Sequence, residues 1–329
     1  MLFRSVIDSF VDVHPDATPF HRRAWVEAVT TGCGHKGHYL LAENGGVTGV
    51  LPLHEIRSRL FGRALVSSGF AVGGGILARN AASVTALSEA AWALATETSC
   101  PTVELRGGVL PDNWAQDTTV YLGFARDLAG NDEAELLAIP RKQRAEVRKG
   151  LGNDLTVDIG DRAAHYAVYA ESVRNLGTPV FPRRLFEAVL DGFGEDADVL
   201  TVRSDGKPLA SVLSLYHRGV VMPYWGGGTA AARPARANDL MYFALMRHAR
   251  ERGCTRFDFG RSKVGTGAAA FKQNWGFEGV PITYAKRSAG KAREINPLDP
   301  KYARKVQLWQ KLPLFVANRL GPMIARGLG

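Results

Sequence analysis

The sequence predicts a mixed α/β protein built from two copies of one structural plan. Each half contains a β-hairpin signal, a cluster of three glycines, a helical stretch, and a strand that follows a cysteine, in that order. The glycine cluster and the cysteine of the second half follow those of the first half by nearly the same number of residues. We therefore expect a duplication, in which each copy is a mostly antiparallel sheet flanked by helices.

The first element of each copy is a β-hairpin. An Asn-Gly-Gly turn separates the apolar runs 39–42 and 47–53, and an Asp-Gly turn separates the runs 199–202 and 209–216. Asn-Gly and Asp-Gly supply the positive φ angles that tight hairpin turns require.

A glycine cluster and a helix come next in each copy. The clusters at 73–75 and 226–228 follow strand-like stretches, and helical stretches follow at 81–98 and 240–252. Asn238 is the expected N-cap of the second helix. Gly253 stands just past its end, as is typical of a helix C-terminus.

A cysteine and a strand complete each copy. Cys100 leads to a strand over 102–107, and Cys254 leads to a strand over 255–261. The three cysteines of the chain lie far apart and form no CxxC pair, which argues against a disulfide or zinc framework. We expect the first domain over 1–138, the second over 139–290, and a tail over 291–329.

A basic helix is predicted at the start of the second domain. Pro140 suits its first turn and Gly150 its end. Arg141, Arg144 and Arg148 then fall on one face, at spacings of three and four residues. Guanidinium groups bind phosphates well, so these residues are candidates for an anionic substrate. The alternative is an ordinary solvated helix face.

Two further segments carry candidate site residues. Tyr224, Trp225 and Gly227 stand where a strand meets the second glycine cluster, so the backbone there either approaches a ligand or forms a bulge. The second segment spans 257–277 and alternates so that Asp258 faces away from its two phenylalanine neighbours.

The segment 257–277 also contains Arg261 and a short predicted helix that carries Phe271 and Lys272. A lysine that enters a partly buried pocket can bind a phosphate or stabilise an oxyanion. The alternative for Lys272 is a surface lysine whose stem covers apolar neighbours.

The composition narrows the class of protein. The chain has 329 residues, a net charge of +9 and 46% hydrophobic residues, which is typical of a globular protein that meets anionic partners. No zinc-protease, P-loop or serine-hydrolase motif occurs, so we expect no metal and no tightly bound cofactor. Acidic residues near the N-terminus argue against a signal peptide, and no apolar run is long enough for a membrane span. We therefore expect a cytoplasmic protein.

These features together resemble the FemAB family, the FemX-like acyl and aminoacyl transferases of the GNAT superfamily. The similarity covers roughly residues 1–290 and is weaker in the first half, where 20–25 resembles the usual opening helix. The closest resemblance is to the subgroup associated with exosortase/PEP-CTERM loci, which is linked to exopolysaccharide gene clusters. The matching segments are 139–149, Tyr224 to Gly227, 240–253, 257–260 and 271–277.

The resemblance implies two tandem GNAT-like domains with the site between them. An acceptor amine would attack an activated acyl ester without a covalent enzyme intermediate. In the family the donor is aminoacyl-tRNA and the acceptor is a nucleotide-linked or lipid-linked peptidoglycan precursor. By position Lys272 resembles the lysine near the reacting centre, with Phe271 packed beside it. Arg144 and Arg148 resemble the basic helix, and Asp258 resembles an acidic strand residue with a structural or catalytic role.

Two departures leave the donor open. The long charged helical hairpin of some members, associated with tRNA, has no counterpart here. The pyrophosphate motif of CoA-dependent GNAT enzymes, [Q/R]xxGx[G/A], is also missing, because the stretch 233–238 has neither glycine. The co-substrate is therefore aminoacyl-tRNA or acyl-CoA.

The function we expect is transfer of an acyl or aminoacyl group to an amine of a nucleotide-linked or lipid-linked precursor of the cell envelope or of an exopolysaccharide. The alternatives are an acyl-CoA-dependent N-acetyltransferase and a non-catalytic protein that binds a glycan or its lipid carrier. The sequence does not specify an oligomeric state.

The tail contains a basic amphipathic stretch over 301–313, in which Pro313 should end or kink the helix. Such a helix either docks on its own domain, which we favour, or lies on an anionic membrane surface. In the second case the protein would sit at the inner face of the membrane.

Overall fold

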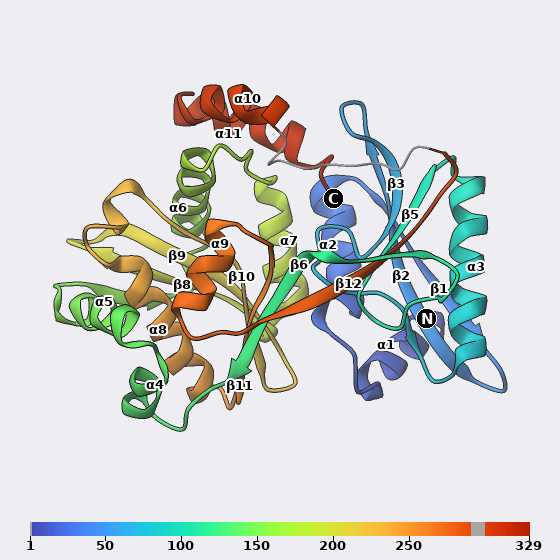
Figure 1. The fold of residues 1–329 in the computed structure, drawn as a ribbon, viewed down its shortest axis with the longest axis horizontal. Coiled ribbons are helices and arrows are strands. Elements are labelled where there is room, and N and C mark those ends of the chain that lie inside the picture. Colours follow the sequence, from blue (N-terminus) through green and yellow to red (C-terminus); the bar gives the residue numbers. More distant parts are fainter. Residues whose placement is uncertain (1, 291–299) are drawn as a thin grey trace.

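The computed structural model describes residues 2–290 and 300–329. One sheet of twelve strands runs through the described chain and carries one copy at each end (Figure 1). Its order is β1-β2-β3-β5-β12-β6-β11-β10-β9-β8-β7, with β4 paired to β2. The strands are β1 (Lys36–Glu43), β2 (Val47–Ser58), β3 (Gly62–Ser67), β4 (Leu77–Ala78), β5 (Thr102–Arg106), β6 (Ala115–Asp127), β7 (Thr156–Ile159), β8 (Ala197–Ser204), β9 (Lys207–His217), β10 (Val220–Gly228), β11 (Arg256–Lys263) and β12 (Gly279–Ser288).

Helices cover the sheet and fill the space between its two ends (Figure 1). None in the described ranges is long and apolar enough to cross a bilayer. The helices are α1 (Leu2–Val13), α2 (Arg23–Cys33), α3 (Ala81–Glu97), α4 (Asp132–Ala138), α5 (Arg141–Gly152), α6 (Arg162–Asn175), α7 (Arg183–Phe193), α8 (Ala237–Glu251), α9 (Gly267–Asn274), α10 (Pro300–Gln310) and α11 (Leu314–Ala325).

The predicted duplication is confirmed by the strand order. Strands β1, β2, β3 and β5 adjoin one another in the same sequence as β8, β9, β10 and β11. In each copy the first three strands are antiparallel, whereas the third and fourth are parallel and are connected through a helix, α3 or α8. Both predicted hairpins, both predicted helices and both strands after the cysteines are present.

The last strand of each copy lies in the middle of the sheet and is exchanged between the copies (Figure 1). Strand β6, from the first half of the chain, pairs with β11 of the second half. Strand β12, from the second half, pairs with β5 of the first half and with β6. The two copies therefore share one continuous sheet.

Helix packing joins the copies as well. Helix α2 of the first half packs against α7 of the second so closely that a side chain at Gly32 would collide with the Leu185 backbone. The buried rings of Trp25 and Trp225 stack at 5.8 Å in the same core. The region between the copies is thus a packed interior, and the pocket described below opens beside it.

One predicted helix start is wrong. Helix α8 begins at Ala237, and its N-cap is Arg236 in a left-handed conformation (φ 58°), not Asn238. The reason is steric: the Asn238 amide packs against the backbone of Gly228, so it is occupied inside the first turn. The expected end is confirmed, since Gly253 follows α8 with φ 80°.

The tail confirms the expectation for Pro313. Helix α10 ends at Gln310, and Pro313 is the N-cap of a second helix, α11, which the sequence did not predict. Both helices pack on α6. The inner faces of both helices therefore dock on their own domain, in agreement with the favoured interpretation, while their outer faces stay exposed.

Candidate functional site

The parallel strands β10 and β11 pair over only two residues. Val220 and Val221 align with Arg256 and Phe257, and further along each strand its register with its other neighbour shifts. Beyond the paired residues both strands line one pocket of about 320 Å³. Where β10 and β11 separate, their backbone N–H and C=O groups no longer pair with each other and instead border this space. Such groups can hydrogen-bond an elongated polar group, such as an activated acyl ester.

Both copies contribute to the pocket. The first copy supplies Phe70 and Val72, and the link between α6 and α7 supplies Phe181. The second copy supplies the remaining lining residues: Met222, Pro223, Tyr224, Trp225, Gly226, Tyr242, Asp258, Phe259, Gly260, Arg261 and Lys272. Mostly apolar walls thus surround a small set of charged groups.

The equivalent space in the first copy is filled. Strands β3 and β5 also pair over only two residues, but the first glycine cluster occupies the gap beyond them. A side chain at Gly75 would overlap the carbonyl oxygen of Gly107, and Ile76 forms bridges with Gly108 and Val109. The open pocket is therefore a feature of the second copy.

Asp258 and Lys272 converge on an irregularity in β11. The strand shifts register between Asp258 and Arg261, and Gly260 in between has φ 66°. The Asp258 carboxylate accepts a hydrogen bond of 2.7 Å from the Gly260 N–H. The Lys272 ammonium donates to the carbonyls of Phe259 (2.7 Å), Gly260 (3.3 Å) and Arg261 (2.9 Å).

Burial favours the uncharged form of both Asp258 and Lys272 and shifts the pKa of each side chain accordingly. Loss of solvent lowers the pKa of Lys272 to about 8, and the nearby Asp258 carboxylate only partly offsets that change. Loss of solvent also raises the pKa of Asp258, against the stabilising Gly260 N–H. Perturbed groups of this kind, placed together in a pocket, are typical of catalytic sites.

Arg261 is held among aromatic rings. Its guanidinium lies over the ring of Tyr121, 4.4 Å from the centroid, and 5.2 Å from that of Tyr284. It also donates a hydrogen bond to the Tyr284 hydroxyl. This places a fixed positive charge at the pocket wall.

Two tyrosines fasten the first-copy loop to the pocket. The Tyr224 hydroxyl donates to the carbonyl of Phe70 (2.6 Å), and the Tyr284 hydroxyl donates to the carbonyl of Val72 (2.8 Å). Phe70 adopts φ 63°, which is costly for an aromatic residue and is maintained by these contacts. The wall contributed by the first copy is thus positioned by the second.

Sequence reasoning missed Phe70, Val72, Phe181 and Tyr284. Phe70 and Val72 directly precede the first glycine cluster, and that proximity was the available signal. Phe181 lies in an irregular link, and Tyr284 lies on the exchanged strand β12. No local pattern indicates either position.

Two predicted site residues lie next to the pocket rather than in its lining. Phe271 packs against the rings of Tyr242 and Trp275, at 5.5 and 6.2 Å, and belongs to the core of the second copy. Gly227 allows α6 to pack closely against β10, because a side chain at this position would overlap Ser172 of α6. Close packing between elements therefore explains this glycine.

The predicted basic helix forms as α5, but its arginines are not part of the pocket lining. Arg144 donates to the carbonyls of Leu137 and Ile139, so its guanidinium caps the end of α4. Arg141 and Arg148 are exposed. The structure thus brings together Tyr224, Trp225, Asp258, Arg261 and Lys272, and separates them from the arginine face.

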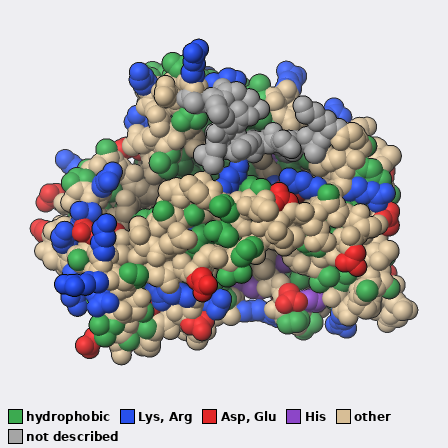
Figure 2. Space-filling view, in the orientation of Figure 1, with side chains coloured by type: hydrophobic (Ala, Val, Ile, Leu, Met, Phe, Trp, Pro, Cys, Tyr) green, Lys and Arg blue, Asp and Glu red, His purple; other side chains and the backbone are tan. Residues whose placement is uncertain are grey.

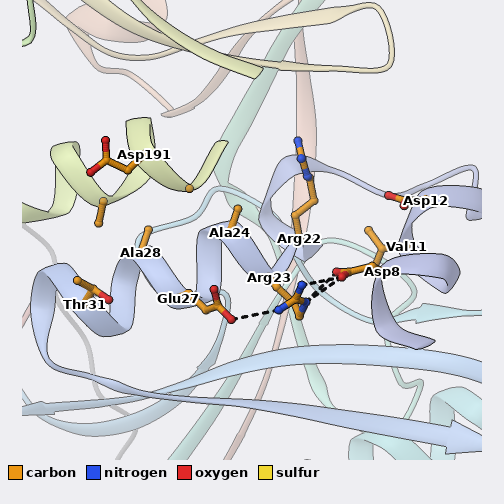
Figure 3. A pocket seen from close by; sticks show the side chains of 12 residues that line it. Asp8, Val11, Asp12, Arg22, Arg23, Ala24, Glu27, Ala28, Thr31 and Asp191 are labelled. Carbon is orange, nitrogen blue, oxygen red and sulfur yellow. Dashed lines mark hydrogen bonds and ion pairs between the residues drawn. The ribbon is translucent and has the colours of Figure 1, made fainter. Parts of the chain in front are cut away.

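A larger cavity of about 570 Å³ lies elsewhere, between α1, α2 and α7 (Figure 3). Arg23 in its wall forms a double hydrogen bond with Asp8 and an ion pair with Glu27, and Arg22 pairs with Asp196. These charges are already neutralised within the protein. The site residues predicted from the sequence do not line this cavity.

Residues 140–273 match the family model described as "Acetyltransferase (GNAT) domain". The matched segment covers most of the second copy. The match includes β10, β11 and Lys272, so most of the pocket lining lies in the matched segment, and Phe70 and Val72 of the first copy complete it. No curated protein matches the chain.

Solved structures extend the GNAT similarity to both halves. FemX superposes with a TM-score of 0.66 at 16% identity, over 94% of this chain and 98% of FemX. The C-terminal domain of a putative lysylphosphatidylglycerol synthetase from Agrobacterium fabrum gives 0.58 at 13% identity, over 87% and 92%. A tandem GNAT protein from the clavulanic acid biosynthesis pathway gives 0.52 at 14%, over 88% and 94%. The tandem GNAT-like fold expected from the sequence is thereby confirmed.

Proposed function

We propose that this protein transfers an acyl or aminoacyl group from an activated ester or thioester to an amine. The observation that carries this proposal is the pocket between β10 and β11. Most of its lining lies in the segment that matches the GNAT domain, and the half-buried Asp258 and Lys272 line it. The walls from both copies exclude water from part of this space, which protects an activated acyl group from hydrolysis.

The reaction forms one bond and breaks one. The nitrogen of the acceptor amine attacks the acyl carbonyl carbon, a C–N bond forms, and the C–O or C–S bond of the donor breaks. The proton lost by the amine passes to the leaving oxygen or sulfur or to a base in the pocket. Orientation of two substrates in one pocket and stabilisation of the oxyanion account for such catalysis without a covalent enzyme intermediate.

Lys272 is the proposed oxyanion stabiliser. Its three donors point to three carbonyls, and the bond to Gly260, at 3.3 Å, is the longest. Exchange of this weakest bond for a developing oxyanion would strengthen the interaction as charge appears. Asp258 holds the same bulge and is the candidate base, because its raised pKa favours proton uptake.

The proposed acceptor is an amine of a nucleotide-linked or lipid-linked precursor of the cell envelope or of an exopolysaccharide. The resemblance to FemAB proteins supports this class, as does the surplus of positive charge. Arg261 at the pocket wall is suited to one anionic group. The exposed Arg141 and Arg148 on α5 would contact phosphates only if a long substrate extended beyond the pocket. The PEP-CTERM-associated subgroup remains part of this proposal.

A CoA-dependent acetyltransferase is the second candidate. The start of α8 favours it, because its N-cap Arg236 makes no side-chain capping bond and the first-turn N–H groups stay available to a phosphate. The acidic Asp239 in that turn would repel a bound anion. Burial raises the pKa of Asp239, which favours its uncharged form and weakens this repulsion.

Product analysis separates these candidates. The protein is incubated with an amine-containing precursor and with either aminoacyl-tRNA or acyl-CoA, and the acceptor is weighed by mass spectrometry. A mass increase by the acyl group identifies the donor, and calorimetric titration with acetyl-CoA checks the second candidate. Binding of a glycan or lipid carrier without any mass change, unaffected by Lys272→Met, would overturn the proposal in favour of a non-catalytic binding protein.

A further inference from the structure

The two tail helices expose apolar side chains to an unusual degree. Phe315 is 76% exposed, the highest value among the large hydrophobic residues described. Leu308 is 67% and Met323 66% exposed. Isolated exposed apolar residues are ordinary on proteins, but three on two consecutive helices indicate a surface with a partner.

Helix α11 has two opposite faces. Ala317, Gly321 and Ala325 are buried and recur every four residues. Gly321 packs against Val180, in the link between α6 and α7, with no room for a side chain. The opposite face therefore points away from the body of the protein.

That outward face of α11 carries Phe315, Arg319 and Met323, which also recur every four residues. Residues at this spacing form one stripe on a helix. A phenylalanine and a methionine with an arginine between them give the stripe both apolar and basic character.

Helix α10 repeats the arrangement. Val306 packs against Gly177, and the Gln310 amide donates to the carbonyl of Asn175, so this side faces α6. Arg304 and Leu308 lie on the other side, Lys311 directly follows the end of the helix, and all three are exposed. Both helices thus turn a mixed apolar and basic stripe away from α6, and we call these two stripes the tail surface.

The charge of the tail surface has one sign. Residues 300–329 contain six lysines and arginines and no aspartate or glutamate. In the space-filling view, basic and apolar side chains lie together at the top of the molecule, where Figure 1 places α10 and α11 (Figure 2). A surface that combines exposed Phe, Leu and Met with basic side chains is complementary to an anionic lipid bilayer.

We infer that the tail surface docks the protein on anionic membranes, with Phe315, Leu308 and Met323 inserted among the lipids and the basic side chains at the headgroups. A nucleic acid would satisfy the charge but would leave three large apolar side chains in water. The membrane is therefore the occupant that accounts for both properties. This inference does not depend on the reaction proposed for the pocket.

Vesicle co-sedimentation tests the inference. The full chain is mixed with vesicles of phosphatidylcholine alone, and with vesicles of equal parts phosphatidylcholine and phosphatidylglycerol. We expect binding to the second and little to the first, with a strong decrease at high salt. The double substitution Phe315→Ser with Met323→Ser should lower the partition coefficient by about tenfold or more. Arg304→Gln, Arg319→Gln and Lys311→Gln should each lower it roughly fivefold.

Matched controls separate this surface from general stickiness. Val280→Ser removes an apolar residue that is 61% exposed on β12, and Lys207→Gln removes an exposed lysine at the start of β9. Neither should alter vesicle binding, and thermal melts should show that every variant is folded. Equal binding to both vesicle types, undiminished binding of the double variant, or binding of RNA without binding of vesicles would overturn the inference.

Discussion

Asp258 and Lys272 bind the same bulge of β11 with opposite polarity. The carboxylate of Asp258 accepts from the Gly260 N–H, and the ammonium of Lys272 donates to the carbonyls of Phe259, Gly260 and Arg261. Each residue proposed for chemistry therefore also shapes the strand that borders the pocket. Stability and turnover must be measured separately for every variant at these two positions.

Replacement of Lys272 tests its proposed role as oxyanion stabiliser. Lys272→Met leaves three carbonyls without this donor, so we expect a loss of about 1–3 kcal/mol in the free energy of unfolding. Turnover should fall about 100-fold to 1,000-fold, the range typical of a lost oxyanion donor. Urea unfolding and acyl-transfer assays measure the two effects. Lys207→Met, at an exposed lysine, is the control, and normal turnover of folded Lys272→Met would refute the assignment.

The lowered pKa of Lys272 predicts an alkaline limb in the pH profile. The folded pKa is about 8 against an ordinary value of 10.5, so the ammonium is lost as the pH rises through about 8. If the cation stabilises the oxyanion, kcat should fall above that pH, and Lys272→Arg should lose the limb because arginine stays charged. The free energy of unfolding should instead increase with pH. Burial disfavours the charged form, so this group's contribution improves as the pH rises from about 8 to 10.5. A kcat that rises through pH 8 would instead indicate a neutral amine acting as base.

Two substitutions at Asp258 separate positioning from proton transfer. Asp258→Asn retains an oxygen that accepts from the Gly260 N–H, so we expect little change in stability. Asp258→Ala removes the acceptor and should cost about 1–2 kcal/mol. If Asp258 is the base, turnover collapses in both variants. If it only holds the bulge, Asp258→Asn stays active, and the base must be sought elsewhere.

The glycine clusters should respond differently in the two copies. Gly227→Ala overlaps the Ser172 side chain, so it should destabilise the protein by about 1–3 kcal/mol, and Ser172→Gly should restore part of the loss. Gly75→Ala meets the carbonyl oxygen of Gly107, which no side-chain change can remove. Thermal melts compare the variants with Gly130→Ala, where the added methyl meets open space. Failure of Ser172→Gly to restore any stability to Gly227→Ala would contradict this distinction.

The repeated elements could be predicted because their signals are local. Turn glycines, helical periodicity and the strand after each cysteine depend on a few neighbouring residues, and the hairpin at 39–53 and helix α3 formed as expected. The chemical character of Asp258 and Lys272 could also be read locally, because β11 and α9 are close in sequence. The hydrogen bonds of both side chains to the bulge at Gly260 could not be predicted from the sequence.

The features that the sequence did not predict depend on contacts between distant segments. The pocket wall at Phe70 and Phe181 is fixed by Tyr224 and by packing between the copies, which no single segment encodes. The arginine face of α5 was predicted correctly as a helix. Its placement relative to the pocket depends on the packing of α5 against α8, which periodicity does not determine. The N-cap at Asn238 failed for the same reason, since Gly228 engages that side chain.

The exchange of β6 and β12 has a consequence for how the molecule assembles. Either half made alone would lack the strand that the other half lends it, and β5 or β11 would be left with an open edge prone to aggregation. The halves therefore should not refold independently, and the intact chain should denature in one concerted step rather than two. Mixed as separate fragments, they would need each other to become soluble.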